Sequence, residues 1–408
     1  MRKNKKVLFF FTNAFPYGHG EQFIFNELAV LAEHYEDTYI FPLHKKNDII
    51  NFIVPQNVSI IQAPGTEEYS KSAIFKNFFL IAQIIISELR RKNGMFVLKN
   101  FRLTLVLILK SIRLSEHIRK QLKTIGLAEV SFYSNWMNEW SLALAILYKK
   151  RDIGNFTFKM RGFDLFDERR EQNFMPFRNF IFKNSTSRLT MSNEGVDYLK
   201  DRGYRNVVCN YPGISMNEIC FKPDLTSFTL VSCSNVYPIK RVELIAESLK
   251  HISFDLKWIH FGSGPDLTVL KKIVSELPST ITVELRGQVT NKEILEFYAN
   301  NHVDCFIHLS TTEGFGYSII EAFSSGIPAI LYPGGAVKEL IQEPFSLGLP
   351  TAITAEIVSD SIKSVRKIFP QNIEFRERVK HFCYQKFDKT QRGKELFNII
   401  QSKPEGVL

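Results

Sequence analysis

Residues 303–339 constrain the fold of this chain more than any other stretch. Val303–Leu309 is a short apolar segment with the length and residue types of a buried strand. Small residues and two glycines follow in 310–316, and then a helical segment that ends before a Gly-Ile-Pro triplet. A second apolar segment, Ala329–Tyr332, runs into a Pro-Gly-Gly turn. This order predicts a βαβ unit whose glycines lie at the carboxyl ends of the strands, where open parallel sheets bind their ligands.

Two glutamates lie on either side of the start of the predicted helix. Glu313 precedes the helix and Glu321 lies one to two turns inside it, while His308 on the preceding strand is more often a core residue than a ligand. The free N–H groups and positive dipole end of a helix N-terminus favour a diphosphate, and Gly314 and Gly316 let a ligand approach the backbone. Because phosphate would repel the carboxylates, we expect them to accept hydrogen bonds from the hydroxyls of a sugar ring and of a ribose. Such a ligand is a nucleotide sugar.

The spacing of the two glutamates is weak evidence by itself, because such a pair arises easily by chance. The whole string, however, resembles the donor-site signature of family-four retaining glycosyltransferases, E-G-F-G-x-S-x-x-E-A-x-x-x-G-x-P followed by G-G-x-x-x-E. The matching residues are Glu313, Gly314, Phe315, Gly316, Glu321, Ala322, Gly326, Pro328, Gly335 and Glu339. The resemblance implies an α/β fold of the GT-B type, with two facing Rossmann-like domains, the donor site in the C-terminal domain and a C-terminal helix that crosses back.

The length of the chain also favours two domains. A chain of 408 residues exceeds the size at which a single hydrophobic core stops growing. We place an acceptor-side domain at 1–216, a donor domain at 217–385 and the returning helix at 386–408. The five cysteines are scattered without a C-x-x-C pair, which favours a reducing compartment over a disulfide framework or a zinc site. The apolar run near the N-terminus has no small-residue cleavage site after it, so we interpret it as a strand and not as a signal peptide.

Two segments of the first domain resemble the same family. The loop P-Y-G-H-G-E-Q-F, with Gly18 and Gly20, resembles the P-x-G-x-G-E-x-F opening of polysaccharide-assembly members, in which it faces the donor diphosphate and the acceptor. Residues 159–169, K-M-R-G-F-D-L-F-D-E-R, resemble the family's x-x-H-G-x-D-L-Y-x-E-R. Arg161 stands where the family usually has histidine, so we expect it to hold a phosphate instead. Asp164 is expected near the acceptor.

The start of the second domain resembles the family's donor-diphosphate loop. In S-C-S-N-V-Y-P-I-K-R, Lys240 matches the family's lysine, and Asn235 stands where an arginine is expected. The second half of that basic pair is therefore either missing or supplied by Arg241. Gly262 and Gly264, in a G-S-G-P turn, match the family's turn on the nucleotide side.

The expected chemistry uses neither a metal nor another cofactor. The chain has no D-x-D triplet of the kind that often holds a metal against a diphosphate. Phosphate charge is then handled by Lys240, Arg161 or Arg241 and by the helix N-terminus. The family transfers its sugar with retention, and no residue here is placed as a nucleophile, so we expect a front-face reaction in which the leaving diphosphate takes the acceptor proton. Glu313 would bind sugar hydroxyls and Glu321 the ribose.

The positive charge of the chain is concentrated in one region. Between Lys71 and Lys123 there are twelve Lys or Arg and two acids, a net charge of +10 that equals the net charge of the whole chain. Residues 70–124 are predicted to form a basic, strongly apolar helical pair with a break at Asn93-Gly94, and no uncharged run is long enough to span a bilayer. This favours attachment to an anionic membrane surface, and the alternative is a buried helix flanked by solvated lysines.

These observations predict a retaining glycosyltransferase. It would move a hexose-type sugar from a nucleotide sugar, with UDP as the expected nucleotide, to a glycan or polyprenyl-diphosphate-linked acceptor in bacterial surface polysaccharide synthesis. We expect it in the cytoplasm, peripheral on the inner face of the plasma membrane. A nucleotide-sugar epimerase of the same two-domain form is the alternative. Nucleic-acid binding is disfavoured, because the basic residues are interleaved with aliphatic and not with aromatic side chains.

Overall fold

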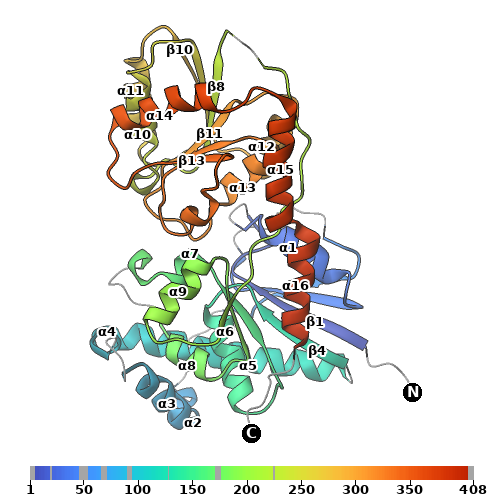
Figure 1. Cartoon of the computed structure of the whole chain (residues 1–408). Helices are drawn as coiled ribbons and strands as arrows, with labels where there is room; N and C mark the ends of the chain where they lie inside the picture. The colour runs from blue at the N-terminus through green and yellow to red at the C-terminus, as the bar shows by residue number, and fades with distance from the viewer. Residues whose placement is uncertain are drawn as a thin grey trace. The chain divides into compact units, whose positions relative to one another are not determined.

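The chain folds into two compact units, each built around one parallel sheet (Figure 1). The first unit is Met1–Tyr211 with Thr390–Leu408, and the second is Pro212–Lys389. The structure is a computed structural model and describes residues 5–18, 21–45, 54–65, 71–89, 94–126, 128–170, 176–223 and 226–402.

The first unit contains a seven-stranded sheet in which every pair of neighbours is parallel. The strand order is β3-β2-β1-β4-β5-β6-β7, so the chain adds strands on one side of β1 and then on the other. The strands are β1 (Lys5–Thr12), β2 (Asp37–Pro42), β3 (Val58–Ile60), β4 (Ala128–Ser134), β5 (Thr157–Met160), β6 (Ser187–Thr190) and β7 (Val207–Cys209).

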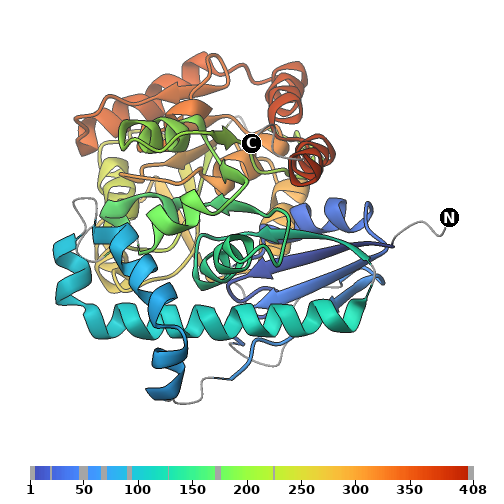
Figure 2. The same cartoon turned by 90° about the horizontal axis from the view of Figure 1, so that it is seen from below.

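Strand β1 shows why this sheet is covered on both faces. Its side chains from Val7 onward are buried, and alternate residues point to opposite faces because the side-chain period of a strand is two. Phe9 and Phe11 belong to the core cluster that includes Trp140, whereas Leu8 and Phe10 belong to the other core cluster of this unit. Figure 2 shows the long helix α5 along one face of the sheet, below its strands.

The helices of the first unit include four in the region for which the sequence predicted a helical pair. Asn77 and Asn100 lie in turns that separate them, as expected from the low helix propensity of asparagine. The predicted break falls at the start of α4, and Asn93 itself lies outside the described residues. The helices are α1 (Ile24–Ala32), α2 (Lys71–Lys76), α3 (Phe78–Leu89), α4 (Gly94–Lys99), α5 (Phe101–Ile125), α6 (Glu139–Lys149), α7 (Gly162–Leu165), α8 (Arg178–Lys183) and α9 (Asn193–Asp201).

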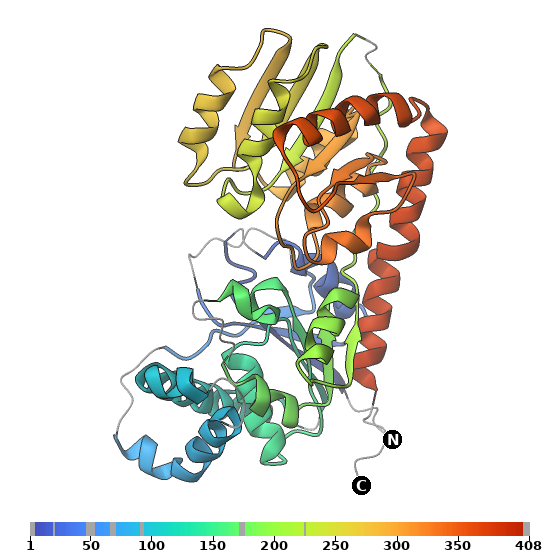
Figure 3. The same ribbon diagram turned by 60° about the vertical axis from the view of Figure 1, so that its left-hand side comes forward.

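The C-terminal helix α16 (Lys389–Gln401) packs on the first unit, as the family resemblance predicted. Its Leu396 and Ile400 join the core cluster that contains Leu8 of β1. At Gly393 the helix backbone is so close to α1 that an added Cβ would lie 2.5 Å from a methyl carbon of Val30. Within this unit, α2 to α4 and α16 lie at opposite sides (Figure 3).

The unit boundaries differ from those predicted after residues 216 and 385. The first falls after Tyr211, because the backbone N–H of Ile214 donates to Phe387 O at 2.7 Å, and Ile214 O accepts from Lys389 N at 3.0 Å. This short pairing ties Ile214 to the second unit. It also keeps Lys389 with the second unit, so the second boundary falls after that residue.

The second unit contains a six-stranded parallel sheet in the order β10-β9-β8-β11-β12-β13. Its strands are β8 (Phe228–Cys233), β9 (Leu256–Phe261), β10 (Ile281–Gly287), β11 (Cys305–His308), β12 (Ala329–Leu331) and β13 (Ser346–Gly348). Its helices are α10 (Val242–Leu249), α11 (Leu267–Ser275), α12 (Asn291–Asn300), α13 (Tyr317–Ser324), α14 (Ala355–Ile368) and α15 (Ile373–Phe387). The predicted strand–loop–helix–strand unit at 303–339 is present as β11, α13 and β12.

Candidate functional site

The strand order of the second sheet reverses between β8 and β11, which pair in parallel. Such a switch point leaves the loops after the two strands on opposite sides of one position at the carboxyl edge of the sheet, where doubly wound folds bind ligands. The loop after β8 leads through Tyr237 into a short 3-10 helix, Pro238–Lys240. The loop after β11 leads to α13. Polar side chains from both loops therefore converge.

The backbone around Glu313 is held by the Pro-Gly-Gly turn that follows β12. Glu313 forms an isolated parallel bridge with Gly335, its N–H donates to Gly334 O at 3.2 Å, and its carbonyl accepts from Ala336 N at 3.2 Å. A Cβ on Gly335 would lie 2.6 Å from Glu313 O, and its φ of 61° is one that favours glycine. The second glycine of the G-G-x-x-x-E string thus positions the first glutamate of the motif.

The carboxylate of Glu313 receives two partners from different elements. Lys240 Nζ forms an ion pair with Oε1, and His308 Nε2 at the end of β11 lies 3.1 Å from the same oxygen. Burial alone would raise the pKa of Glu313, but the His308 hydrogen bond and the Lys240 charge outweigh it and hold the pKa well below its ordinary value. Glu313 is therefore ionised at neutral pH. Sequence reasoning had favoured a core role for His308.

Arg241 provides a second cationic group beside Lys240. Its guanidinium carbon lies 4.4 Å from the centroid of the Tyr332 ring, within the range of a cation–π contact. Nη1 of Arg241 is buried and has no hydrogen-bond partner among the residues that the structure describes. A buried, unpaired guanidinium N–H next to a lysine at a switch point is suited to an anionic ligand.

Glu321 lies inside α13, as predicted. Its Oε1 accepts a hydrogen bond of 2.7 Å from Asn291 Nδ2 at the start of α12. Burial raises the pKa of Glu321 to about 7, and the Asn291 bond opposes the shift only in part. The carboxylate of Glu321 therefore has one donor within the protein and can still accept a hydrogen bond from a ligand.

The glycines of this site have different roles. Gly316 caps α13 with a φ of 100°, and a Cβ there would meet the Ile319 side chain at 2.9 Å. A Cβ on Gly262 would lie 1.8 Å from Ser234 O, and one on Gly264 would lie 2.2 Å from Val236 O. These last two glycines, predicted to bind nucleotide, allow the turn after β9 to touch the backbone of the loop after β8. Their contact therefore shapes the loop that leads to Lys240.

Two other members of the motif are buried. Gly314 is buried, and Phe315 is enclosed in the core. The Phe315 ring packs edge-on against Phe387 of α15, with ring centroids 5.4 Å apart. The predicted ligand role of Phe315 is thus limited to its backbone, because its ring is committed to packing.

The glycine loop of the first unit is fastened by a glutamate. Gly18 has a φ of 71°, and Gly20 lies outside the described residues. The carboxylate of Glu21 accepts hydrogen bonds from Phe15 N at 2.6 Å, from the N–H groups of the two residues before Phe15, and from Trp136 Nε1. This glutamate of the P-x-G-x-G-E-x-F string therefore holds the loop after β1 against the loop after β4.

Arg161 lies in the interior of the first unit, where it is 2% exposed. Its Nε donates to Asn135 Oδ1 at 2.6 Å, and the guanidinium carbon lies 4.2 Å from the centroid of the Phe23 ring. Its Nη2 is 3.4 Å from Glu27 Oε1, and that oxygen also pairs with Lys159 Nζ at 2.7 Å. Arg161 was predicted to hold a phosphate, and in the structure protein groups already surround its side chain.

Asp164 is buried and organises the backbone next to Arg161. Its two carboxylate oxygens accept from Met137 N and from Arg161 N, both at 2.6 Å. Burial raises the pKa of Asp164 to about 6, which these backbone hydrogen bonds oppose. The predicted acceptor-side residue thus ties the loop after β4 to the loop after β5.

Comparisons with known proteins agree with this architecture. Residues 220–378 match the family described as glycosyl transferases group 1. The chain is 24% identical over 143 residues to the GtfA subunit of a UDP-N-acetylglucosamine–peptide N-acetylglucosaminyltransferase of Streptococcus pneumoniae serotype 4. That match covers 33% of this chain and 27% of the relative, so the chain spans only about a quarter of the relative's length.

Two solved structures share the fold over nearly the whole chain. HepE of Anabaena, in complex with UDP and glucose, has a TM-score of 0.65 at 13% identity, with 97% of this chain and 98% of HepE covered. The lipopolysaccharide outer core galactosyltransferase WaaB has a TM-score of 0.65 at 16% identity, with 97% and 99% covered. The two parallel sheets with their covering helices thus form a glycosyltransferase-type architecture.

Proposed function

We propose that the chain is a retaining glycosyltransferase that uses a nucleotide sugar, because residues 220–378 match the group 1 glycosyltransferase family and the fold is that of solved glycosyltransferases. The observation that carries the proposal is the meeting of Lys240, His308 and Glu313 at the switch point of the second sheet. A cation and a carboxylate side by side suit a ligand that has both phosphate and hydroxyl groups.

The diphosphate of the donor would bind to Lys240 and Arg241. A lysine ammonium has three N–H groups, so Lys240 can keep its contact with Glu313 while another N–H reaches a phosphate oxygen. Arg241 brings its unpaired Nη1 to the same anion. This assigns the second half of the basic pair to Arg241 and not to Asn235.

The two motif carboxylates would bind the two rings of the donor. Glu313 is ionised and accepts hydrogen bonds from sugar hydroxyls, and Glu321 accepts from the ribose. UDP is the expected nucleotide, in line with the HepE complex and with the donor named for the GtfA relative. Hexose transfer would be consistent with the galactosyltransferase WaaB.

The reaction would be a front-face transfer that retains the anomeric configuration. As the bond to the sugar breaks, negative charge grows on the leaving diphosphate, and Lys240 and Arg241 stabilise it more in the transition state than in the ground state. The diphosphate oxygen takes the proton of the acceptor hydroxyl as the new bond forms. The protein supplies position and charge, and no residue forms a covalent intermediate.

The acceptor would be a glycan or a polyprenyl-diphosphate-linked sugar of a bacterial surface polysaccharide. Exposed apolar side chains on α2 to α5 favour a position on the inner face of the plasma membrane, peripheral and facing the cytoplasm. Phe75 and Phe79 are each 82% exposed. Among the described residues, no helix is long and apolar enough to cross a bilayer, so contact would be at the interface.

A panel of nucleotide sugars tests the proposal. One of them, a UDP sugar by expectation, should raise the melting temperature of the purified chain, and Arg241→Ala should reduce that shift. Incubation of the same donor with an acceptor should give a glycoside of unchanged anomeric configuration. No shift with any nucleotide sugar would contradict the proposal, and conversion of the donor without an acceptor would favour the epimerase alternative.

A further inference from the structure

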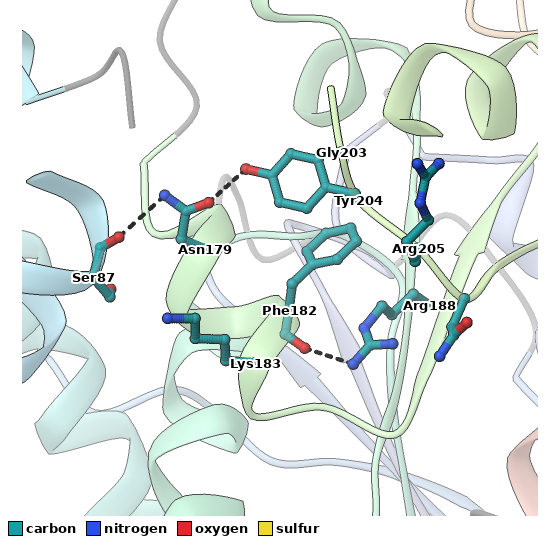
Figure 4. Close-up of a pocket in the computed structure, with 9 residues that line it drawn as sticks. Ser87, Asn179, Phe182, Lys183, Arg188, Gly203, Tyr204 and Arg205 are labelled. Carbon is teal, nitrogen blue, oxygen red and sulfur yellow. Dashed lines mark hydrogen bonds between the residues drawn. The ribbon is translucent and has the colours of Figure 1, made fainter. Parts of the chain in front are cut away.

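A pocket of about 380 Å³ lies in the first unit, away from the carboxyl edge of its sheet (Figure 4). Arg188 at the start of β6 lines it, as does Asn206, which directly precedes β7. These positions are at the amino ends of the strands. Because doubly wound folds bind their ligands at the carboxyl ends, this pocket is separate from the edge that the glycine loop occupies.

Hydrogen bonds hold the walls of the pocket together. Asn179 Nδ2 of α8 donates to Ser87 O of α3 at 3.2 Å, and Tyr204 Oη donates to Asn179 Oδ1 at 2.8 Å. Arg188 Nη2 donates to Phe182 O at 2.6 Å, which fixes one side of its guanidinium (Figure 4). The pocket is therefore built by four elements, namely α3, α8, β6 and the loop before β7.

The charge that lines the pocket is positive. Lys183, Arg188 and Arg205 are among its lining residues, and none of those lining residues is Asp or Glu. The carboxylate of Glu88 in α3 accepts a hydrogen bond of 3.0 Å from Phe180 N, and burial raises its pKa to about 7. The one acid of α3 is thus used within the protein and is only partly charged at neutral pH. Three cations without a matching carboxylate favour an anionic ligand.

The helix that walls the pocket also presents an apolar surface. Ile86, which precedes Ser87, and Leu89, two residues after it, are exposed, as are Phe78 and Phe79 in the first turn of α3. Exposed apolar side chains beside a cationic pocket match the two layers of a membrane interface, where phosphate groups lie next to the acyl region.

We propose that this pocket binds the phosphate of an anionic phospholipid headgroup while the exposed apolar side chains of α2 and α3 enter the outer acyl region. The inference deepens the membrane attachment put forward under the proposed function and rests on it. A free phosphate ion is also an anion, but it would leave the large exposed Phe75, Phe78 and Phe79 side chains uncovered. The lipid satisfies both surfaces at once.

Vesicle co-sedimentation with a pair of charge-matched variants tests this pocket. The pocket variant is Lys183→Gln with Arg205→Gln. The control is Lys120→Gln with Lys123→Gln, which removes two exposed charges from the end of α5. On vesicles of phosphatidylcholine with phosphatidylglycerol, the pocket variant should bind about tenfold more weakly than the unmodified chain, and the control less than about threefold. Equal losses in the two variants, or no loss in the pocket variant, would overturn the proposal.

Two further measurements distinguish a lipid ligand from a free anion, and effects on the pocket from effects on the donor site. Phe75→Ser with Phe79→Ser leaves the pocket cations in place and should still weaken vesicle binding severalfold, whereas unchanged binding would reject the lipid. UDP affinity, measured by calorimetry on each sample, should stay the same in all these variants. If the unmodified chain binds UDP but does not bind anionic vesicles, the proposed membrane attachment fails while the donor site stands. If it binds anionic vesicles but not UDP, the proposed donor site fails while the membrane attachment stands.

Discussion

The strand order of each unit has one switch point, and the charged side chains near the two switch points differ in burial. Near the one between β1 and β4, the side chains of Lys159 and Glu27 pair at exposures of 0% and 5%, with Arg161 beside them. At the one between β8 and β11, Lys240 and Glu313 pair at exposures of 20% and 13%. The first set of charges is satisfied by protein groups, while the second remains open to a ligand. Similar residue types thus stabilise one unit and would bind donor in the other.

The largest effect that tests this comparison is expected from Glu27→Ala in the first unit. Lys159 and Arg161 would be left as buried charges without their carboxylate, which typically costs about 3–5 kcal/mol. Denaturant unfolding measures the loss, and Glu129→Ala, an exposed glutamate of β4, is the control. An unchanged unfolding midpoint in Glu27→Ala would show that the interior cluster is not the support we describe.

The pH dependence of the same cluster has a definite sign. Although burial alone would raise it, the charges of Lys159 and Arg161 lower the pKa of Glu27 to about 2, below its value of 4.5 in an unfolded chain. The stability due to Glu27 is therefore present above pH 4.5 and is lost as the pH falls toward 2. Glu27→Gln should show a shallower loss of stability across this window.

A comparable change in the second unit should affect activity and not folding. In Lys240→Ala, turnover should fall on the order of a hundredfold, because charge on the leaving diphosphate would lose one of the two cations proposed to stabilise it. The melting temperature should change little, since Lys240 is partly exposed. Lys250→Ala, which removes a partly exposed and ion-paired lysine of the same unit, is the control for kinetics. A rise in the Michaelis constant with unchanged turnover would make Lys240 a ground-state contact only.

A smaller effect is expected from the titration of Glu321. Its folded pKa of about 7 lies above the unfolded value of 4.5, so its contribution to stability is present below pH 4.5 and is lost as the pH rises through 7. Donor binding has the opposite dependence, because the ribose hydroxyls need the carboxylate. UDP affinity should fall roughly tenfold from pH 8 to pH 6. A flat profile in the unmodified chain, or the same slope in Glu321→Gln, would assign the titration to another group.

The smallest effect, namely none, is expected from removal of divalent metals. In the described parts of both units, no group of three or more His, Cys, Asp or Glu could hold a metal ion. If Lys240 and Arg241 handle the phosphate charge, transfer should continue at the same rate in excess EDTA. A loss of transfer that magnesium or manganese restores would contradict this assignment.

Local patterns were sufficient to predict most elements around the second switch point. The apolar segment before Glu313, the glycine loop and the helix that carries Glu321 are contiguous, so their hydrophobic period and glycine positions identify them without long-range contacts. The division of the helical region at Asn77 and Asn100 was missed, since helix ends depend on weak local preferences.

The sequence alone determined that Lys240, Glu313 and Glu321 belong to one motif-bearing α/β domain, because each is placed by residues close to it in the chain. Only the tertiary structure showed which groups surround Arg161. Its partner Glu27 lies 134 positions away in the sequence, and burial is set by the packing of such distant elements. The guanidinium charge of an arginine binds a carboxylate of its own chain as readily as a phosphate. An arginine that the sequence predicts to bind an anionic ligand can therefore be an interior ion-pair partner.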